Sequence, residues 1–253
     1  MQANKTIWII GGSSGIGFEL VKHCLQKNYT VIASSRNASS NKDLKELKEQ
    51  YKSSISLLDI DVSLKEEIKD KVKNAWNIYN KIDIWFYNAG AYEVMNINSW
   101  ETSKFEQMNE VNYLGIIRVM NELLPYFKEQ KAGQWIWNSS LSSYFGLPQG
   151  GGYSAPKAAL VNLAQSLQPE LLRENIKLQI INHGFVKTRL TYKNSFEMPQ
   201  LMEASYTAQK ILKEIETSSS FEIRFPIVLS LFLSLLRFLP YKLSLNITKR
   251  TLP

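Results

Sequence analysis

Short apolar segments alternate with longer segments of helical periodicity along most of this 253-residue chain. The apolar segments are rich in Ile, Val, Leu and aromatic residues, which is typical of parallel strands buried on both faces of a sheet. Six such strands are predicted, at 6–10, 30–34, 55–58, 82–87, 134–138 and 177–182, and a last edge strand at 220–224.

Amphipathic segments between these strands predict helices at 15–27, 43–51, 63–80, 100–127, 153–173 and 204–215. Ser63 is expected to cap the third helix, with Glu66 three residues later completing a capping box. Repeated strand–helix–strand units imply right-handed crossovers. The pattern therefore predicts an α/β, Rossmann-like doubly wound parallel sheet with helices on both faces. Since no linker interrupts the pattern, we expect one domain over residues 1–253.

Composition fits a globular protein of this type, with 44% hydrophobic and 21% charged residues. Cys24 is the only cysteine, so no intrachain disulfide can form. This cysteine content agrees with a protein of a reducing compartment. The first twelve residues lack a charged region followed by a long apolar stretch. We therefore expect no signal peptide and a cytoplasmic protein.

The net charge of +7 is concentrated at the carboxyl end of the chain. No acidic residue follows Glu222, whereas five cations do: Arg224, Arg237, Lys242, Lys249 and Arg250. A general nucleic-acid binder spreads its basic residues differently, so nucleic acid is not an expected partner. Residues 225–253 are instead predicted to form an apolar, basic C-terminal extension.

Two interpretations of this extension stay open. Only 13 residues lie between Pro226 and Pro240, and Arg237 interrupts them, whereas a membrane-spanning helix needs about 20 apolar residues. On a helix, Ser230, Ser234 and Arg237 would form one narrow polar stripe on an otherwise apolar surface. Such a helix either packs over the substrate cleft or another subunit, or makes peripheral membrane contact through residues 225–250.

Glycines follow the first predicted strand in the order Gly11-Gly12-Ser13-Ser14-Gly15-Ile16-Gly17. Gly11, Gly15 and Gly17 allow a tight turn and a close approach to a pyrophosphate, which the next helix N-terminus would bind. Glycine spacing alone also fits an ordinary strand–helix turn. The strand before it and the helix after it favour a dinucleotide site.

The second predicted strand ends in Ser34-Ser35-Arg36-Asn37. A carboxylate at this place would bind the ribose hydroxyls and favour NAD(H). None is present, and Arg36 can instead hold a 2′-phosphate with charge-assisted hydrogen bonds. NADP(H) is therefore the favoured cofactor, with a solvated loop residue as the alternative interpretation of Arg36.

Tyr153 and Lys157 are four residues apart, so they share one face of a helix. A phenol ordinarily ionises near pH 10, and a nearby ammonium lowers that pKa toward the range of a general acid or base. Ser140 follows a strand end, where its hydroxyl can polarise a substrate oxygen. Ser139, Ser142 and Ser143 are weaker candidates for that role.

Several further motifs occur in order with these residues: Asp61-Val62, Asn88-Ala89-Gly90, Asn112, and Tyr153-Ser154-Ala155-Pro156-Lys157. Together with the glycine turn and Ser140, they resemble the short-chain dehydrogenase/reductase family over about residues 5–225. The resemblance implies a sheet of about seven strands and hydride transfer between a nicotinamide and a carbonyl or alcohol. It also implies a homodimer or homotetramer built on helices 100–127 and 153–173.

The resemblance assigns roles to individual residues. Tyr153, Ser140, Lys157 and Asn112 would be catalytic, with Asn112 holding a water that links Lys157 to solvent. Asn88 is expected beside the adenine ribose or, alternatively, as a brace of the central strands. The implied cofactor-binding residues are Gly11, Ser13, Ser14, Gly15, Ile16, Gly17, Arg36, Asp61, Val62, Asn88, Ala89, Gly90, Tyr153, Lys157, Val186 and Thr188. No metal site is predicted.

The chain departs from the family pattern at three positions, one of which is Tyr87, where the family more usually has Asn. His183 stands where the family usually has proline, and Pro156 is unusual between Tyr153 and Lys157, which predicts a helix that begins close to Tyr153. An apolar pocket is expected from Leu141, Tyr144, Phe145, Leu147, Phe185, Met198, Leu201 and Met202.

The sequence therefore predicts an NADP(H)-dependent oxidoreductase of an apolar carbonyl or alcohol. Two alternatives remain: an NADP(H)-binding sensor or scaffold without turnover, and a peripheral membrane protein. Intact Ser140, Tyr153 and Lys157 favour an enzyme over a sensor.

Overall fold

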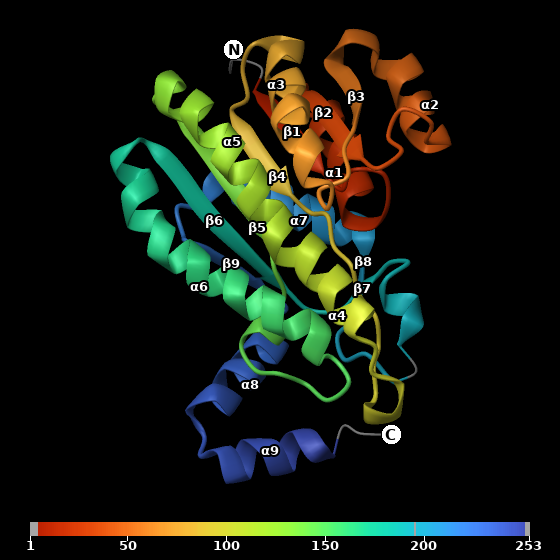
Figure 1. Ribbon diagram of the computed structural model, residues 1–253, viewed down its shortest axis with the longest axis vertical. Coiled ribbons are helices and arrows are strands. Elements are labelled where there is room, and N and C mark those ends of the chain that lie inside the picture. Colours follow the sequence, from red (N-terminus) through yellow and green to blue (C-terminus); the bar gives the residue numbers. More distant parts are fainter. Residues whose placement is uncertain (1–4, 195, 251–253) are drawn as a thin grey trace.

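A seven-stranded parallel sheet forms the middle layer of the computed structural model, which describes residues 5–194 and 196–250 (Figure 1). Its spatial order is β3-β2-β1-β4-β5-β6-β9. The strands are β1 Thr6–Ile10, β2 Thr30–Ser35, β3 Ile55–Asp59, β4 Ile84–Tyr87, β5 Gly133–Asn138, β6 Ile176–His183 and β9 Glu222–Phe225. The predicted doubly wound sheet is confirmed. The strand order reverses between β1 and β4, where such sheets form a ligand crevice.

Helices cover both faces of this sheet (Figure 1). On one face lie α3 Ile68–Tyr79, α5 Gly115–Gln130 and α6 Gly151–Arg173, and on the other lie α1 Gly15–Gln26, α2 Lys42–Tyr51 and α7 Ala204–Thr217. Strand residues alternate between the two cores: Ile7 and Ile9 pack with α1 and α7, whereas Trp8 and Ile10 pack on the opposite face. Because both of their faces are buried, the central strands β1 and β4 are apolar at almost every position.

Two helix predictions differ from the structure. Ser63 does not cap a helix, because its backbone N and its hydroxyl both donate to Asp61 Oδ1, at 3.0 and 2.6 Å. The chain first makes the short turn Lys65–Glu67, and α3 then begins at Ile68. The predicted helix 100–127 consists of α4 Thr102–Asn109 and α5, joined by the π-helical turn Glu110–Leu114.

The C-terminal residues form two short helices at one end of the molecule, α8 Ile227–Phe238 and α9 Tyr241–Lys249 (Figure 1). A separate pair of short strands, β7 Val186–Lys187 and β8 Met202–Glu203, lies in the segment before α7. None of the helices that the structure describes is long and apolar enough to cross a membrane. The last residues of the predicted extension, 251–253, lie outside the described residues, as do residues 1–4.

Candidate active site

A cavity of about 800 Å³ opens at the carboxyl edge of the sheet, where β1, β4, β5 and β6 end. It brings together most of the residues that the sequence predicted. The predicted residues that line it are Gly11, Ser13, Ser14, Gly15, Ile16, Arg36, Asp61, Val62, Asn88, Ala89, Gly90, Ser140, Tyr153, Lys157, Val186 and Thr188. Of the predicted set, Gly17 and Asn112 do not line it.

The glycine turn between β1 and α1 forms one end of this cavity. Gly11 and Gly15 have positive φ angles of 89° and 54°, a conformation that side-chain-bearing residues rarely adopt. A Cβ on Gly17 would lie 2.0 Å from the Gly11 carbonyl oxygen, so Gly17 shapes the turn from behind. The first turn of α1 carries no acidic residue. Its free backbone N–H groups are therefore suited to a phosphate.

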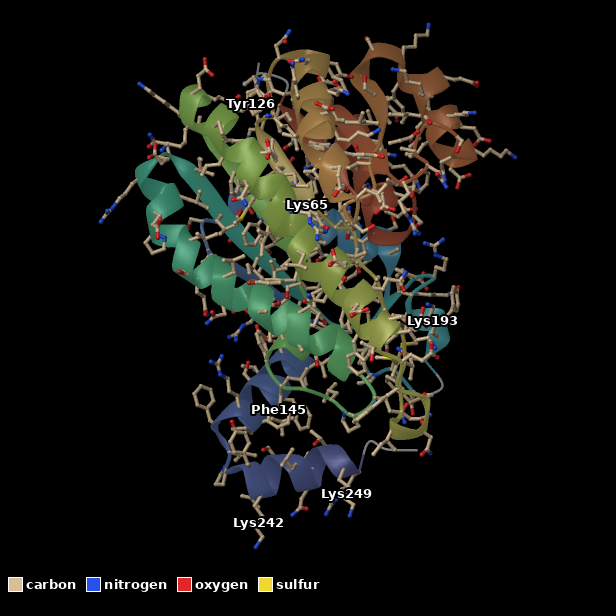
Figure 2. All side chains as sticks on the ribbon, viewed as in Figure 1. Lys65, Tyr126, Phe145, Lys193, Lys242 and Lys249 are labelled. Carbon is tan, nitrogen blue, oxygen red and sulfur yellow. The ribbon has the colours of Figure 1, made fainter. Side chains whose placement is uncertain are left out.

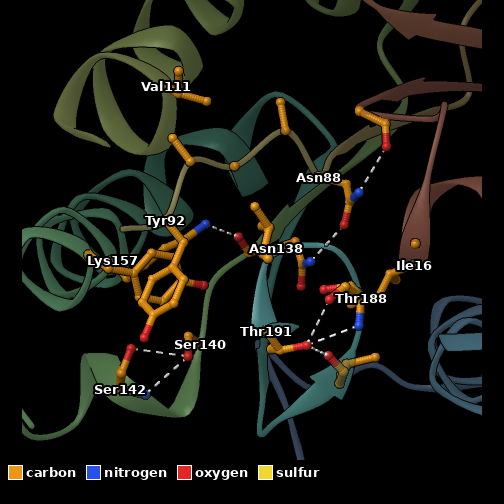
Figure 3. A pocket seen from close by; sticks show the side chains of 18 of the residues that line it. Ile16, Asn88, Tyr92, Val111, Asn138, Ser140, Ser142, Lys157, Thr188 and Thr191 are labelled. Carbon is orange, nitrogen blue, oxygen red and sulfur yellow. Dashed lines mark hydrogen bonds between the residues drawn. The ribbon is translucent and has the colours of Figure 1, made fainter. Parts of the chain in front are cut away.

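Asn88 links three strand ends (Figure 3). Its Nδ2 donates to the Gly11 carbonyl at 3.0 Å, and its Oδ1 accepts from Asn138 Nδ2 at 2.8 Å. The structure thus gives Asn88 the bracing position that was the alternative to ribose contact. Asn138 Oδ1 is buried without a hydrogen-bond partner among the described residues.

Arg36 and Asp61 lie where the adenosine half of a dinucleotide was expected. Arg36 is exposed at the end of β2, and no ion pair within the described residues occupies it. The Asp61 carboxylate is partly engaged, because Oδ1 accepts from both donors of Ser63. Asp59, the other carboxylate nearby, accepts hydrogen bonds from the backbone N and the hydroxyl of Ser39. Arg36 is therefore the charged side chain available at this end.

Ser140 and Tyr153 meet at the other end of the cavity. The Ser140 hydroxyl accepts from Ser142 N at 3.2 Å and lies 3.1 Å from the Ser142 hydroxyl (Figure 3). Burial raises the pKa of the Tyr153 phenol to about 12, and a hydrogen bond with the Ser140 side chain opposes part of this rise. The Tyr92 ring packs edge-on against Tyr153, with centroids 5.2 Å apart. Ser139 donates instead to the Lys157 carbonyl.

Lys157 is buried one helical turn after Tyr153. Its Nζ donates to the Asn138 carbonyl oxygen at 2.7 Å and lies 5.7 Å from the centroid of the Tyr153 ring. Burial lowers the pKa of Lys157 to about 7. Burial is therefore the largest influence on the pKa of both groups, and the pKa of Tyr153 lies above its ordinary value rather than below it as expected. Pro156 lies within the first turns of α6, which begins at Gly151, close to Tyr153 as predicted.

Asn112 is fully buried in the π-helical turn behind the cavity. Its Oδ1 accepts from Ala91 N at 2.9 Å, and its Nδ2 donates to the Ala91 carbonyl at 2.8 Å. Both ends of the amide therefore fix the irregular segment that follows Gly90. Its role in proton supply stays a prediction.

His183 ends β6 and lines the cavity. Its Nδ1 lies 2.7 Å from the Gly184 carbonyl, so Nδ1 carries the hydrogen and donates. Burial lowers the pKa of His183 to about 4, which keeps the ring neutral near pH 7. The following loop reaches the glycine turn, because a Cβ on Gly15 would lie 3.0 Å from the Thr188 methyl group.

The apolar end of the cavity differs from its predicted composition. Leu141, Leu147 and Phe185 line it, but Tyr144, Phe145, Met198, Leu201 and Met202 do not. Tyr144 and Phe145 pack instead against the cluster that joins Leu141 to α8. The sequence analysis missed Tyr92, Phe196, Leu229 and Leu233 as lining residues. The apolar C-terminal segment was the sequence feature that pointed to Leu229 and Leu233, because one interpretation placed this segment over the cleft.

Comparison with known proteins agrees with this arrangement. The family model for short chain dehydrogenases matches residues 5–198. An uncharacterized oxidoreductase of Staphylococcus epidermidis is 29% identical over 208 residues, which cover 82% of this chain and 89% of the relative. A short-chain dehydrogenase from Streptomyces avermitilis has a TM-score of 0.83 and 21% identity over 98% of both chains. A short chain dehydrogenase from Burkholderia cenocepacia, solved in complex with NADP, has a TM-score of 0.79 and 19% identity over 92% of both chains.

The two solved structures share the fold of this chain, whereas the family model also matches its sequence over most of its length. The matched residues include the glycine turn, Ser140, Tyr153 and Lys157. The protein therefore belongs to the short-chain dehydrogenase/reductase family of oxidoreductases.

Proposed function

We propose that this protein is an NADP(H)-dependent reductase of apolar aldehydes or ketones, or the corresponding alcohol dehydrogenase. The observation that supports this most directly is the contact between Ser140 and Tyr153 in a cavity that also holds the glycine turn. A paired hydroxyl and phenol is suited to a substrate oxygen, and a glycine turn is suited to a pyrophosphate.

The residues present fit a phosphorylated dinucleotide. Gly11 and Gly15 adopt the positive φ angles that shape the turn, and a Cβ on Gly15 would reach Thr188 across it. Arg36 would hold the 2′-phosphate, and Val186 and Thr188 would hold the carboxamide end. The Burkholderia relative was solved with NADP, which supports the same cofactor here. When bound, the nicotinamide supplies hydride to a carbonyl carbon or accepts it from an alcohol.

Tyr153 and Ser140 would act on the substrate oxygen. The Ser140 hydroxyl donates a hydrogen bond to the carbonyl oxygen, and the Tyr153 phenol transfers its proton to that oxygen as negative charge develops there. A Tyr153 pKa of about 12 keeps the phenol protonated near pH 7, which suits the reductive direction. Lys157 supplies positive charge behind Tyr153 below its pKa of about 7.

An apolar substrate is favoured by the end of the cavity beyond Ser140. Leu141, Leu147, Phe185, Leu229 and Leu233 line this end. Apolar walls with a few convergent polar groups are typical of sites for small hydrophobic molecules. We infer an aldehyde or ketone with an alkyl or aromatic body.

The proposed enzyme is a single-domain protein of the cytoplasm. One catalytic domain extends through the chain, with residues 225–253 as an extension, and it forms a cytoplasmic homodimer or homotetramer through α5 and α6. A sensor without turnover is disfavoured because Ser140, Tyr153 and Lys157 are all present and meet in one cavity.

The test follows NADPH absorbance with aldehydes and ketones of increasing chain length. We expect kcat/KM to rise with chain length and to fall by about 10²–10⁴-fold in Tyr153→Phe. NADPH binding, measured by calorimetry, should persist in that variant. Binding without turnover of any carbonyl would favour the sensor, and a lack of NADPH binding would refute the cofactor assignment.

A further inference from the structure

Helix α8 leaves most of its large apolar residues exposed and buries the small polar residue Ser230. Ser230 is fully buried, whereas Phe238 is 80% exposed. The inward apolar positions Leu233 and Leu236 pack on Leu141. The other exposed apolar residues of this helix are Ile227, Val228, Leu231, Phe232 and Leu235. A water-facing helix shows the opposite arrangement, so this outer face is suited to an apolar environment.

Helix α9 repeats the arrangement. Ser244 and Thr248 are buried, whereas Tyr241, Leu243 and Leu245 are exposed. Lys242 and Lys249 lie on the side of α9 that faces away from the body of the protein (Figure 2). Together α8 and α9 form one continuous end of the molecule, on which exposed apolar side chains are mixed with cations.

The charge on this end has a single sign. Arg237, Lys242, Lys249 and Arg250 are exposed, and no ion pair within residues 5–194 and 196–250 neutralises them. The last acidic residue, Glu222, points inward, where it accepts hydrogen bonds from the Asn182 amide and the Tyr144 hydroxyl. The surface therefore combines apolar anchors with cations that no acid of this segment balances.

We propose that α8 and α9 dock on an anionic lipid surface. Exposed Leu, Phe and Val side chains would enter the acyl boundary, and the cations would bind lipid phosphates. Helix α8 has 12 residues, about 18 Å at 1.5 Å per residue, which is too short to cross a hydrocarbon core of about 30 Å. The pair therefore lies in the interface.

A second copy of the chain fits this surface less well. A two-fold interface places the same patch of both copies face to face. The four cations of this end would then face a patch that carries the same four cations, with no acidic residue of the patch to pair with them. Juxtaposed like charges oppose association, whereas anionic headgroups satisfy them.

Docking would place the cavity close to the lipid. Leu229 and Leu233 of α8 line the cavity, while their neighbours Leu231 and Phe232 face outward. An apolar substrate dissolved in the membrane would then reach Ser140 and Tyr153 along α8. This consequence rests on the proposed function, whereas docking itself does not.

Vesicle flotation of the purified full chain tests the docking. We expect flotation with vesicles of phosphatidylcholine plus phosphatidylglycerol, little with phosphatidylcholine alone, and a loss in high salt. Lys242→Glu/Lys249→Glu should weaken binding by about tenfold or more, and Leu231→Ser/Phe238→Ser by a similar factor. The matched control Lys69→Glu/Lys73→Glu, on exposed positions of α3, should float like wild type. Circular dichroism should show that all variants are folded.

Failure of wild type to float with anionic vesicles would overturn the proposal. So would flotation unaffected by both tail variants, or self-association in solution that Leu231→Ser/Phe238→Ser abolishes while vesicle binding is absent. The last result would make this end a subunit interface. NADPH oxidation with a water-soluble aldehyde, measured on the same samples, reports separately on the proposed function, because it needs no membrane.

Discussion

The Lys157 ammonium donates a 2.7 Å hydrogen bond to the backbone carbonyl of Asn138, the last residue of β5. The Asn138 side chain donates to Asn88, and Asn88 donates to the carbonyl of Gly11 (Figure 3). A chain of hydrogen bonds thus joins the lysine of α6 to the glycine turn after β1. The two ends of the proposed site are held in one geometry by the strands between them.

The first prediction concerns the pH dependence of reduction. Burial lowers the pKa of Lys157 from 10.5 to about 7, so the ammonium is lost as pH rises through about 7. Because the ammonium supports proton transfer from Tyr153, kcat/KM for carbonyl reduction should fall above that pH. Lys157→Met should lower kcat/KM at pH 6 by about 10²-fold or more and remove this limb of the profile. If kcat/KM of Lys157→Met still falls above the same pH, another group causes the fall.

Replacement of Asn88 should cost stability. Asn88→Ala removes the donor to Gly11 O and the acceptor for Asn138 Nδ2, which leaves polar groups unpaired. We expect the free energy of unfolding in urea to fall by about 1–3 kcal/mol. Asn77→Ala, at an exposed position of α3, is the matched control and should change it by less than about 0.5 kcal/mol. Equal effects of the two replacements would contradict a bracing role.

Ser140 and Ser142 can be separated by a pair of alanine variants. The Ser140 side chain is hydrogen-bonded with Tyr153, whereas the Ser142 hydroxyl donates to Ser140. Ser140→Ala should lower kcat by about 10²–10³-fold, the loss typical of one oxyanion donor, with little effect on NADPH binding. Ser142→Ala should lower kcat much less. The assignment fails if Ser142→Ala is the more damaging replacement.

Arg36 should set the preference between the two nicotinamide cofactors. Arg36→Ala removes the charge proposed to hold the 2′-phosphate, so the Kd for NADPH should rise by about 10–100-fold while that for NADH stays nearly constant. Fluorescence titration with both cofactors measures this ratio. Arg173→Ala, exposed at the far end of α6, controls for a general loss of positive charge. A parallel rise for both cofactors would exclude phosphate recognition.

Local sequence determined the sheet and most of the cavity. Strands buried on both faces are mostly apolar, so their positions could be predicted from runs such as Thr6–Ile10. The carboxyl ends of parallel strands lie along one edge, which brought Gly11, Asn88 and Ser140 together as expected. The helical repeat alone was enough to predict that Tyr153 and Lys157 share one face of a helix.

Tertiary packing decided what local pattern leaves open. The Asn112 side chain is hydrogen-bonded to the backbone of Ala91, and the Ser63 hydroxyl donates to Asp61 instead of capping a helix. The partners of a polar side chain depend on its neighbours in space, which the local pattern does not give. Tyr144 and Phe145 pack against α8 instead of lining the predicted pocket.

The C-terminal extension shows the same limit most clearly. The helical repeat grouped Ser230, Ser234 and Arg237 as one polar stripe of α8, but Ser230 is buried, Ser234 is half-buried and Arg237 is exposed. A repeat fixes faces only relative to the helix axis. Which face meets the protein depended on the fit of Leu233 and Leu236 against Leu141, and this packing buried Ser230 and left Phe238 exposed. The sequence by itself determined the fold class and the chemistry gathered at one edge of the sheet, whereas only the tertiary structure decided which surface of the extension faces outward.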